Sequence, residues 1–219
     1  TSSPTLVGFF VCGELVRFRF IMKKYIMKTE VNDLLISLND FKNDLDIELN
    51  TDTTVIRNEL YRGQKEELNI IIDLSHLNEK GFWDVAKIST SPLVATHSNV
   101  HEICPHSRNL TNKQLEAIKD SNGIVGLNLA TAFLRTDGKM EEDTNLEIIL
   151  RHFDHLINIL GEDKVAIGSD FDGAKVPLKI KNLEGMNVLK EFLLNSGYNK
   201  NLVIKLFSQN WLNFFYKHY

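Results

Sequence analysis

The chain has 219 residues, enough for one sizeable domain with a buried core. Its 43% hydrophobic and 25% charged residues and its formal net charge of −4 are ordinary for a soluble globular protein, and the lack of a Lys/Arg cluster argues against a nucleic-acid partner. Two cysteines argue against a disulfide scaffold, and no apolar run reaches the roughly 18 residues of a membrane span. We therefore expect a cytoplasmic protein that binds neither nucleic acid nor membrane.

Residues 1–68 form an atypical N-terminal segment that the sequence assigns poorly. Apolar residues at roughly helical spacing predict a helix over residues 31–49, although the polar run over residues 39–67 allows a loosely ordered segment instead. None of the seven histidines lies in this segment, because the first of them is His76. Histidine-based chemistry is therefore confined to the rest of the chain.

From residue 69 onward, short apolar runs alternate with amphipathic stretches. The apolar runs are rich in β-branched residues and have the pattern of strands buried on both faces. Thr111 and Gln114 have the spacing of a capping box at the start of one helix. The alternation predicts an α/β architecture with a parallel sheet. We predict strands over residues 70–74, 93–96, 123–128 and 165–168, and helices over residues 81–88, 111–118, 145–160, 184–196 and 199–216.

Polar residues directly follow the predicted strands, and this placement decides between two parallel architectures. No Gly-x-Gly-x-x-Gly or Walker-type loop follows a strand, which disfavours an open nucleotide-binding sheet. In a barrel the strand ends converge on one face, where several strands together build a site. We therefore predict a TIM-type (β/α)₈ barrel. Eight units need roughly 250 residues, so residues 69–219, with only four clear units, are predicted to form a barrel truncated to its C-terminal half.

Two histidines and an aspartate occupy matching positions after predicted strands. His76 and His97 lie 21 residues apart, each directly after a strand, and Asp170 follows a later strand. Adjacent parallel strands are about 4.8 Å apart, so both imidazoles can flank one metal ion, and this ligand chemistry suits zinc. Each histidine taken alone could equally be a hydrogen-bonded strand-end residue. Asp170 could orient a water or transfer a proton, or only begin a tight turn with Asp172 and Gly173.

Other candidate residues lie on a loop and on a helix. Arg108 lies on the loop beyond His97, where its guanidinium could hold a substrate carboxylate through two hydrogen bonds or pair with a surface acid. His152 and His155 lie three residues apart on the predicted helix over residues 145–160. We expect both to be structural, because that helix packs on the outside of the barrel.

Four motifs follow one another in the second part of the chain. They are Asp73-Leu74-Ser75-His76, Thr96-His97-Ser98-Asn99, Arg108-Asn109-Leu110-Thr111 and Gly168-Ser169-Asp170-Phe171-Asp172-Gly173. In this order and with this spacing they resemble the membrane (renal) dipeptidase family of zinc metallopeptidases. The resemblance spans about residues 68–217 and is far more specific than any one motif.

The resemblance implies a TIM-type barrel with a binuclear zinc site that hydrolyses the amide bond of dipeptides. His76 and His97 would hold the second zinc ion, and Arg108 would bind the terminal carboxylate of the dipeptide. Asp170 would assist proton transfer at the scissile amide. Two zinc ions would supply a hydroxide near neutral pH and polarise the carbonyl group.

The sequence departs from the family's pattern before His76. The family carries a His-x-Asp pair on its first strand and a glutamate that bridges the zinc ions, and the pair is absent here because no histidine precedes His76. The candidate glutamates Glu14, Glu30, Glu48 and Glu59 lie in no context that matches the family. Catalytic zinc sites ordinarily have three protein ligands. We therefore expect at most one partial zinc site and an incomplete, conceivably inactive, dipeptidase-like hydrolase.

Two other readings stay open at this point. One is a different metal-dependent amidohydrolase barrel, which also places histidines and an aspartate on late strands. The other is a non-catalytic fragment, since half a barrel has open strand edges that favour association. The partners we expect are a dipeptide substrate and either a second copy of the chain or a complementing N-terminal fragment.

Overall fold

A computed structural model of the protein describes residues 71–218. From Ile72 onward these residues belong to one unit of the chain. The helix predicted over residues 31–49 and the domain boundary predicted after residue 68 lie outside the described residues, so both stay predictions.

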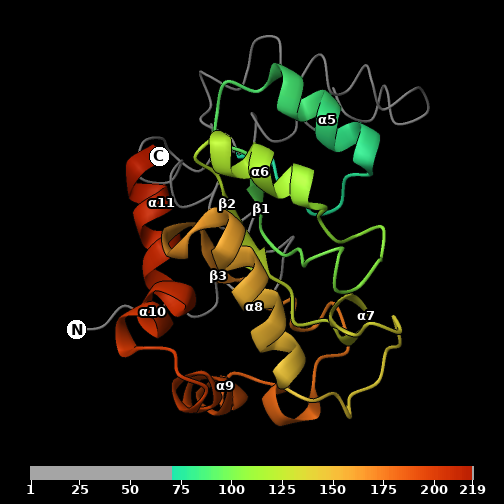
Figure 1. The fold of residues 1–219 in the computed structure, drawn as a ribbon, viewed down its shortest axis with the longest axis vertical. Coiled ribbons are helices and arrows are strands. Elements are labelled where there is room, and N and C mark those ends of the chain that lie inside the picture. Colours follow the sequence, from blue (N-terminus) through green and yellow to red (C-terminus); the bar gives the residue numbers. More distant parts are fainter. Residues whose placement is uncertain (1–70, 219) are drawn as a thin grey trace, which may run out of the picture. The chain divides into compact units, whose positions relative to one another are not determined.

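Three parallel strands form the centre of the described structure (Figure 1). They are β1 (Val94–Ala95), β2 (Ile124–Leu127) and β3 (Val165–Ile167), paired in the order β1-β2-β3. Every residue of the three strands is buried, as expected of a parallel sheet covered by helices on its connections. The prediction of a parallel α/β architecture is confirmed by this pairing.

The first predicted strand, over residues 70–74, is much shorter than expected within the described residues. Only Asp73 pairs with the sheet, through an isolated parallel bridge to Val94, and the Leu74 amide donates to the Val94 carbonyl at 2.8 Å. The Asp73 side chain accepts a hydrogen bond from the Ser75 amide. The apolar run therefore contributes a single bridge within the described residues and not a full strand.

Helices follow the strands and cover the sheet. Two differences from the predicted helices stand out. A short helix, α7, follows β2 where none was predicted, and the last predicted helix is divided by a π-helical turn, η5, into α10 and α11. The helices are α5 (Glu79–Ile88), α6 (Asn112–Asp120), α7 (Thr131–Leu134), α8 (Glu147–Leu160), α9 (Gly185–Asn195), α10 (Lys200–Ile204) and α11 (Asn210–His218), with short turns η3 (Glu162–Lys164), η4 (Leu178–Ile180) and η5 (Lys205–Gln209).

Local sequence signals explain where two of these helices begin. Thr111 caps α6 by accepting from the Gln114 amide, while the Gln114 side chain accepts from the Thr111 amide at 2.9 Å. This reciprocal pair is the predicted capping box, and it satisfies two backbone donors that the first turn would leave unpaired. At α5, the Asn78 side chain accepts from the Gly81 amide at 2.8 Å.

The last helix of the chain, α11, packs against β3. The Asn210 side chain donates to the Val165 carbonyl at 2.7 Å, and the indole of Trp211 donates to the Ile167 carbonyl at 3.0 Å. These bonds satisfy strand carbonyls in a buried environment, where an unpaired acceptor is costly. α11 is thereby fixed to the last strand.

Two glycines let neighbouring strands approach closely at the end that carries the polar residues. A Cβ atom on Gly126 would lie 2.0 Å from the Thr96 carbonyl oxygen, and one on Gly168 would lie 1.9 Å from the same atom. Any larger residue would push the strands apart. The close approach places the residue after Thr96, which is His97, directly beside the ends of β2 and β3.

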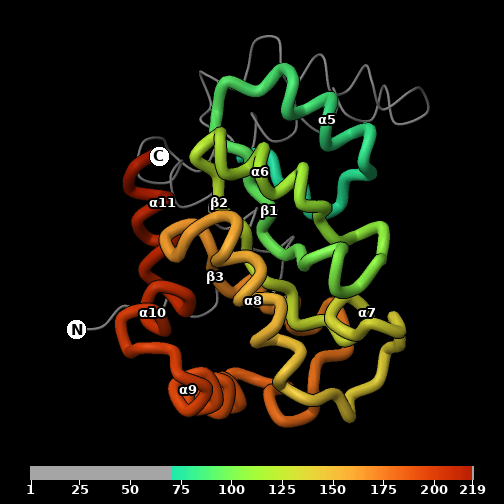
Figure 2. The backbone as a smooth tube through the Cα atoms, in the orientation of Figure 1, coloured from blue at the N-terminus to red at the C-terminus, as the bar shows by residue number. Residues whose placement is uncertain are grey.

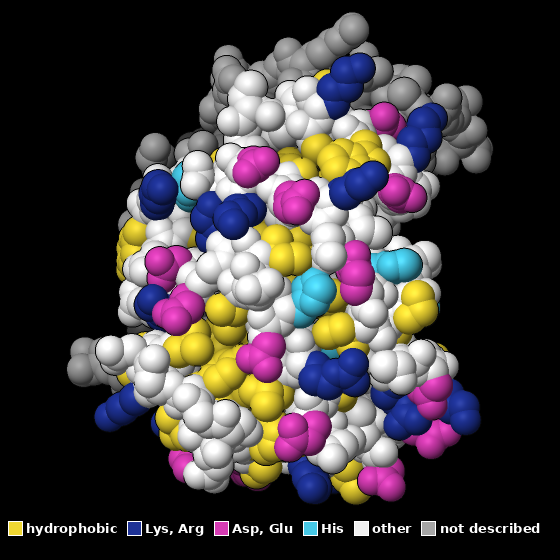
Figure 3. Space-filling model, viewed as in Figure 1, with side chains coloured by type: hydrophobic (Ala, Val, Ile, Leu, Met, Phe, Trp, Pro, Cys, Tyr) yellow, Lys and Arg dark blue, Asp and Glu magenta, His cyan; other side chains and the backbone are white. Residues whose placement is uncertain are grey.

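On the face seen in Figure 3, side chains of both charge signs are interspersed, with smaller apolar areas between them. Within residues 71–218, none of the helices combines the length and the apolar composition that a membrane crossing requires.

Candidate functional site

The residues that follow the parallel strands meet at one edge of the sheet. β1 is followed by Thr96 and His97, β2 by Asn128, and β3 by the segment that leads to Asp170. The chain then continues in long connections that Figure 2 traces. The connection after β1 contacts α7, since the side chain of Asn109 donates to the Phe133 carbonyl at 2.8 Å. The carboxyl edge of a parallel sheet is where α/β proteins build their sites.

His76 and His97 face each other at this edge. Their Nε2 atoms lie 2.8 Å apart and their ring centroids 4.9 Å apart. His97 is buried, with 6% of its surface exposed, whereas His76 is exposed. Partial desolvation, together with the charges of Arg108 and His97, lowers the pKa of His76. A lowered pKa favours the neutral imidazole, which is the form that binds a metal ion.

The ring nitrogens of the two imidazoles are ligands that zinc binds, and their separation is close to the one that a shared zinc ion requires. Two nitrogen ligands of one tetrahedral zinc ion lie about 3.3 Å apart, so the Nε2 atoms of His76 and His97 need to separate by only a few tenths of an ångström. Within residues 71–218, no cluster of three or more His, Cys, Asp or Glu side chains is arranged to hold a metal. The described residues therefore provide two of the ligands that such a centre requires.

A buried carboxylate, Asp73, joins the two histidine-bearing segments. Its Oδ1 atom accepts from the amide and the hydroxyl of Ser75, at 3.1 and 2.7 Å, and from the amide of Thr96 at 3.0 Å. Its Oδ2 atom accepts from the Thr96 hydroxyl at 2.6 Å. Burial acts to raise the pKa of Asp73, but these hydrogen bonds and the neighbouring His97 lower it overall. Asp73 was recognised in the sequence only as part of a motif and a strand, and its position two residues before Ser75, in Asp73-Leu74-Ser75-His76, was the available signal.

Arg108 lies against the exposed histidine. Its Nη1 atom is 2.6 Å from Nδ1 of His76, and its Nη2 atom is 3.0 Å from Nε2 of the same ring. The guanidinium carbon lies 5.4 Å from the centre of the Phe133 ring, and the Arg108 amide donates to Nδ1 of His106 at 3.1 Å. Phe133 on α7 was not predicted, because no pattern along the chain connects it with Arg108.

Asp170 is held at the same edge by an asparagine. The Asn128 side chain donates to Asp170 Oδ2 at 2.9 Å, and the same nitrogen lies 3.5 Å from the carbonyl of His97. Asn99 fixes Asn128 in turn, accepting from its amide at 3.0 Å and donating to its carbonyl at 2.9 Å. Asp170 has a φ of 57°, in the left-handed region that aspartate tolerates better than most residues. Asn128, directly after β2, and Asn99, in the connection after β1, thus position the Asp170 carboxylate.

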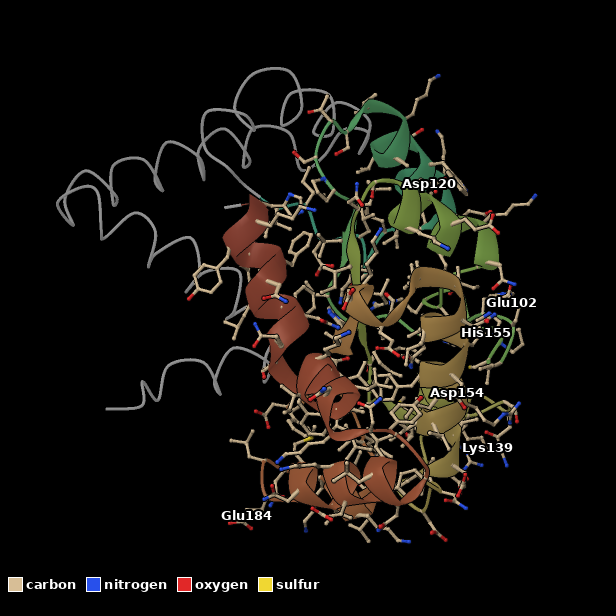
Figure 4. The ribbon with its side chains drawn as sticks, turned by 60° about the vertical axis from the view of Figure 1, so that its left-hand side comes forward. Glu102, Asp120, Lys139, Asp154, His155 and Glu184 are labelled. Atoms are coloured by element: carbon tan, nitrogen blue, oxygen red, sulfur yellow. The ribbon has the colours of Figure 1, made fainter. Side chains whose placement is uncertain are left out.

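Two further histidines lie on α8, away from this edge. His152 is fully buried; its Nδ1 atom accepts from the Val100 amide at 3.2 Å and its Nε2 atom contacts the Leu134 carbonyl at 2.9 Å. His155 contacts the Asn112 side chain at 2.7 Å and lies near Glu102 in Figure 4. Both rings have structural partners, as expected for this helix.

Comparison with known proteins identifies the chain's relatives. The model of the membrane dipeptidase family, peptidase family M19, matches residues 63–217. A Klebsiella pneumoniae protein named for its place in the pqqA 5' region is 54% identical over 149 residues, which are 68% of this chain and 55% of that protein. The dipeptidase tcpJ of Claviceps purpurea is 29% identical over 185 residues, covering 80% of this chain and 42% of the relative.

A solved structure gives the same relationship in three dimensions. A metallopeptidase from Rhodobacter sphaeroides, crystallised with a phosphinate mimic of the dipeptide L-Ala-D-Ala, superposes with a TM-score of 0.72 and 48% sequence identity. The match covers 74% of this chain and 46% of that protein. The chain thus spans about half the length of the relatives it matches.

Proposed function

This chain belongs to the membrane dipeptidase family, peptidase family M19, and we propose that it acts in the metal-assisted hydrolysis of dipeptides. The observation that carries the proposal is the convergence of two imidazoles, His76 and His97, whose Nε2 atoms lie 2.8 Å apart. Arg108 lies against one ring, and Asp170 is tied through an asparagine side chain to the backbone of the other. These are the residue types that binding and cleaving a small peptide with a free carboxylate requires.

His76 and His97 would hold a zinc ion through their Nε2 atoms. When bound at such a centre, zinc lowers the pKa of a water molecule to near neutrality and polarises the carbonyl group of the substrate. The buried position of His97 and its hydrogen bonds keep its ring in one orientation, so the site is organised before the substrate arrives.

Arg108 would bind the terminal carboxylate of the dipeptide. Its guanidinium hydrogen bonds to the neutral ring of His76, and a carboxylate is a stronger partner, because both members of the new pair are charged. The planar guanidinium can donate two parallel hydrogen bonds to one carboxylate. This contact would select substrates with a free C-terminus close to the scissile bond.

Asp170 would transfer the proton. A carboxylate within reach of the reacting groups can take a proton from the attacking water and deliver it to the leaving nitrogen. The hydrogen bond from Asn128 and the left-handed backbone of Asp170 hold the carboxylate in place.

We also propose that the described sheet is one side of a TIM-type barrel. The support is the sequential parallel order β1-β2-β3, the helical connections, and the gathering of polar residues at one edge. A second copy of the chain or a complementing N-terminal fragment would supply further strands. Size-exclusion chromatography with light scattering tests for such a partner, and a monomer that binds zinc and turns over substrate contradicts the need for one.

A second candidate function is binding without catalysis. It is favoured by one observation, namely that the described residues bring only two metal-ligating histidines together. In that case the chain binds a metal or a dipeptide but does not turn it over.

Metal analysis combined with a hydrolysis assay separates the two candidates. The full chain is loaded with zinc and assayed on a panel of dipeptides that includes L-Ala-D-Ala, the dipeptide whose mimic was bound by the structural relative. We expect hydrolysis that His97→Gln abolishes and that the control His155→Gln, on α8 away from the site, retains. Zinc-loaded chain without turnover on any dipeptide would leave only the binding candidate.

A further inference from the structure

The side chain of Thr96 connects the buried carboxylate of Asp73 with the ring of His97. Oδ2 of Asp73 accepts from the Thr96 hydroxyl at 2.6 Å, and the Thr96 oxygen lies 2.7 Å from Nδ1 of His97. The carboxylate itself is 3.9 Å from that nitrogen, so the hydroxyl is the bridge. Asp73 and His97 are both buried, each with 6% of its surface exposed, and hydrogen bonds in such surroundings are strong and directional.

The direction of each hydrogen bond follows from counting hydrogens. Oδ1 of Asp73 accepts from the Ser75 hydroxyl and from two backbone amides, those of Ser75 and Thr96. An ionised carboxylate is only an acceptor, so the hydrogen between Asp73 and Thr96 belongs to the hydroxyl. A hydroxyl has one hydrogen, and Thr96 can then only accept from His97. Nδ1 of His97 therefore carries the ring proton, and its Nε2 atom has a lone pair.

Nε2 of His97 faces the neighbouring imidazole, since it lies 2.8 Å from Nε2 of His76. The Arg108 guanidinium contacts both ring nitrogens of His76, at 2.6 and 3.0 Å, so it does not decide which of them carries the proton. The assignment of the His97 tautomer therefore rests on the hydrogen bonds of Asp73 and Thr96.

We propose that Asp73 and Thr96 form a relay that fixes His97 as the Nδ1–H tautomer and aims its Nε2 lone pair at the point shared with His76. Both are positioning residues, and their importance for catalysis rests on the proposed function, in which that nitrogen binds a metal. Partners of this kind set the tautomer and the orientation of a ligating imidazole. Because Asp73 also holds Ser75, the residue before His76, it fixes both histidine-bearing segments at once.

Long-range ¹H–¹⁵N NMR of the histidine rings tests the relay directly. The full chain is prepared without metal, labelled on histidine nitrogen, and measured at a pH where the rings are neutral; His97→Gln assigns the resonances. We expect His97 as the Nδ1–H tautomer in the wild type and in Thr96→Ser, which keeps the hydroxyl. Thr96→Val removes the bridge without changing the size of the side chain, so the population should move to Nε2–H.

Asp73→Asn makes a sharper prediction. The amide oxygen is expected to take the place of Oδ1, where three donors converge, which puts the amide NH₂ opposite Thr96. Thr96 then accepts from the asparagine and donates to His97, and the tautomer inverts. Thr131→Val is the matched control, since the Thr131 hydroxyl is also buried but has no hydrogen-bond partner among residues 71–218; it should leave His97 unchanged. If Asp73→Asn does not fold, Thr96→Val decides.

Calorimetry with zinc alone measures the consequence for metal binding. Thr96→Val should weaken zinc binding about 10- to 100-fold, as loss of such partners generally does, and Thr131→Val should not. A wild-type His97 with its proton on Nε2, or a Thr96→Val variant with unchanged tautomer and zinc affinity, overturns the relay. A shifted tautomer in a chain that hydrolyses no dipeptide leaves the relay standing and removes only the proposed function.

Discussion

The buried imidazole of His152 predicts a specific dependence of stability on pH. Its ring accepts from the Val100 amide and contacts the Leu134 carbonyl in the interior beneath α8, and burial lowers its pKa from 6.5 to about 4. The unfolded chain therefore binds a proton at this residue at a higher pH than the folded chain does. Between those two pKa values, acidification stabilises the unfolded state alone.

The magnitude follows from the difference between the two pKa values. Each pKa unit corresponds to about 1.4 kcal/mol, so the contribution of His152 to the free energy of unfolding is about 3 kcal/mol. It is fully present above pH 6.5, is lost as the pH falls toward about 4, and changes little below that. Since the pKa of Asp73 is lowered from 3.8, the loss of its contribution falls at still lower pH.

Urea denaturation of the full chain at a series of pH values between 7 and 4 measures this contribution. His152→Gln should be less stable than the wild type at pH 7 but should lose about 3 kcal/mol less on acidification. His155→Gln, on the same helix but only partly buried, is the control. It should lose nearly as much stability on acidification as the wild type, because the charge of His155 is the smallest of the causes that lower the pKa of His152. If His152→Gln and the wild type lose the same stability over this range, the argument from burial is wrong.

Three further predictions concern the substrate clamp, the strand ends and a helix cap. Arg108→Ala should lower kcat/KM for free dipeptides about 10- to 100-fold, because a charge-assisted contact with the substrate carboxylate is lost. The loss should be smaller for dipeptides whose C-terminus is amidated, and equal losses for both kinds of substrate would contradict the clamp. Gly126→Ala should lower the free energy of unfolding by about 1–3 kcal/mol, because its Cβ atom would lie 2.0 Å from the Thr96 carbonyl oxygen. An unchanged denaturation midpoint would show that the strands can separate without cost. Thr111→Ala should lower the free energy of unfolding by about 1 kcal/mol, and Thr111→Ser should lower it much less, since only the serine can still accept from the Gln114 amide. Thermal melts of the two variants measure the difference.

Local signals made part of this structure predictable. The capping box of Thr111 and Gln114 needs only residues three apart, and it formed as expected. The buried runs that became β2 and β3 were recognisable because both faces of a parallel strand are apolar. The run before Ser75 was predicted as a strand on the same grounds, but within the described residues only Asp73 pairs with the sheet.

Most of the side-chain contacts between the strand ends could not be predicted from the spacing of residues in the sequence. Asn128 and Asp170 are 42 residues apart, and the partner of Arg108 on α7, Phe133, lies in a helix that was not predicted. Each of these contacts depends on how far neighbouring strands extend and how closely they approach, and small residues such as Gly126 control that approach. Spacing along the chain indicated the edge of the sheet and the pair His76 and His97, but not the partners of Arg108 and Asp170.

The sequence by itself determined the α/β alternation, the family and the side of the sheet on which His76, His97, Arg108 and Asp170 gather, because these depend on periodicity and on motifs that are contiguous in the chain. Only the tertiary structure decided which atoms meet. The bonds of Asp73 to Thr96, and through it to His97, are made across neighbouring segments, and hydrogen bonds depend on tenths of an ångström that only the packed sheet sets.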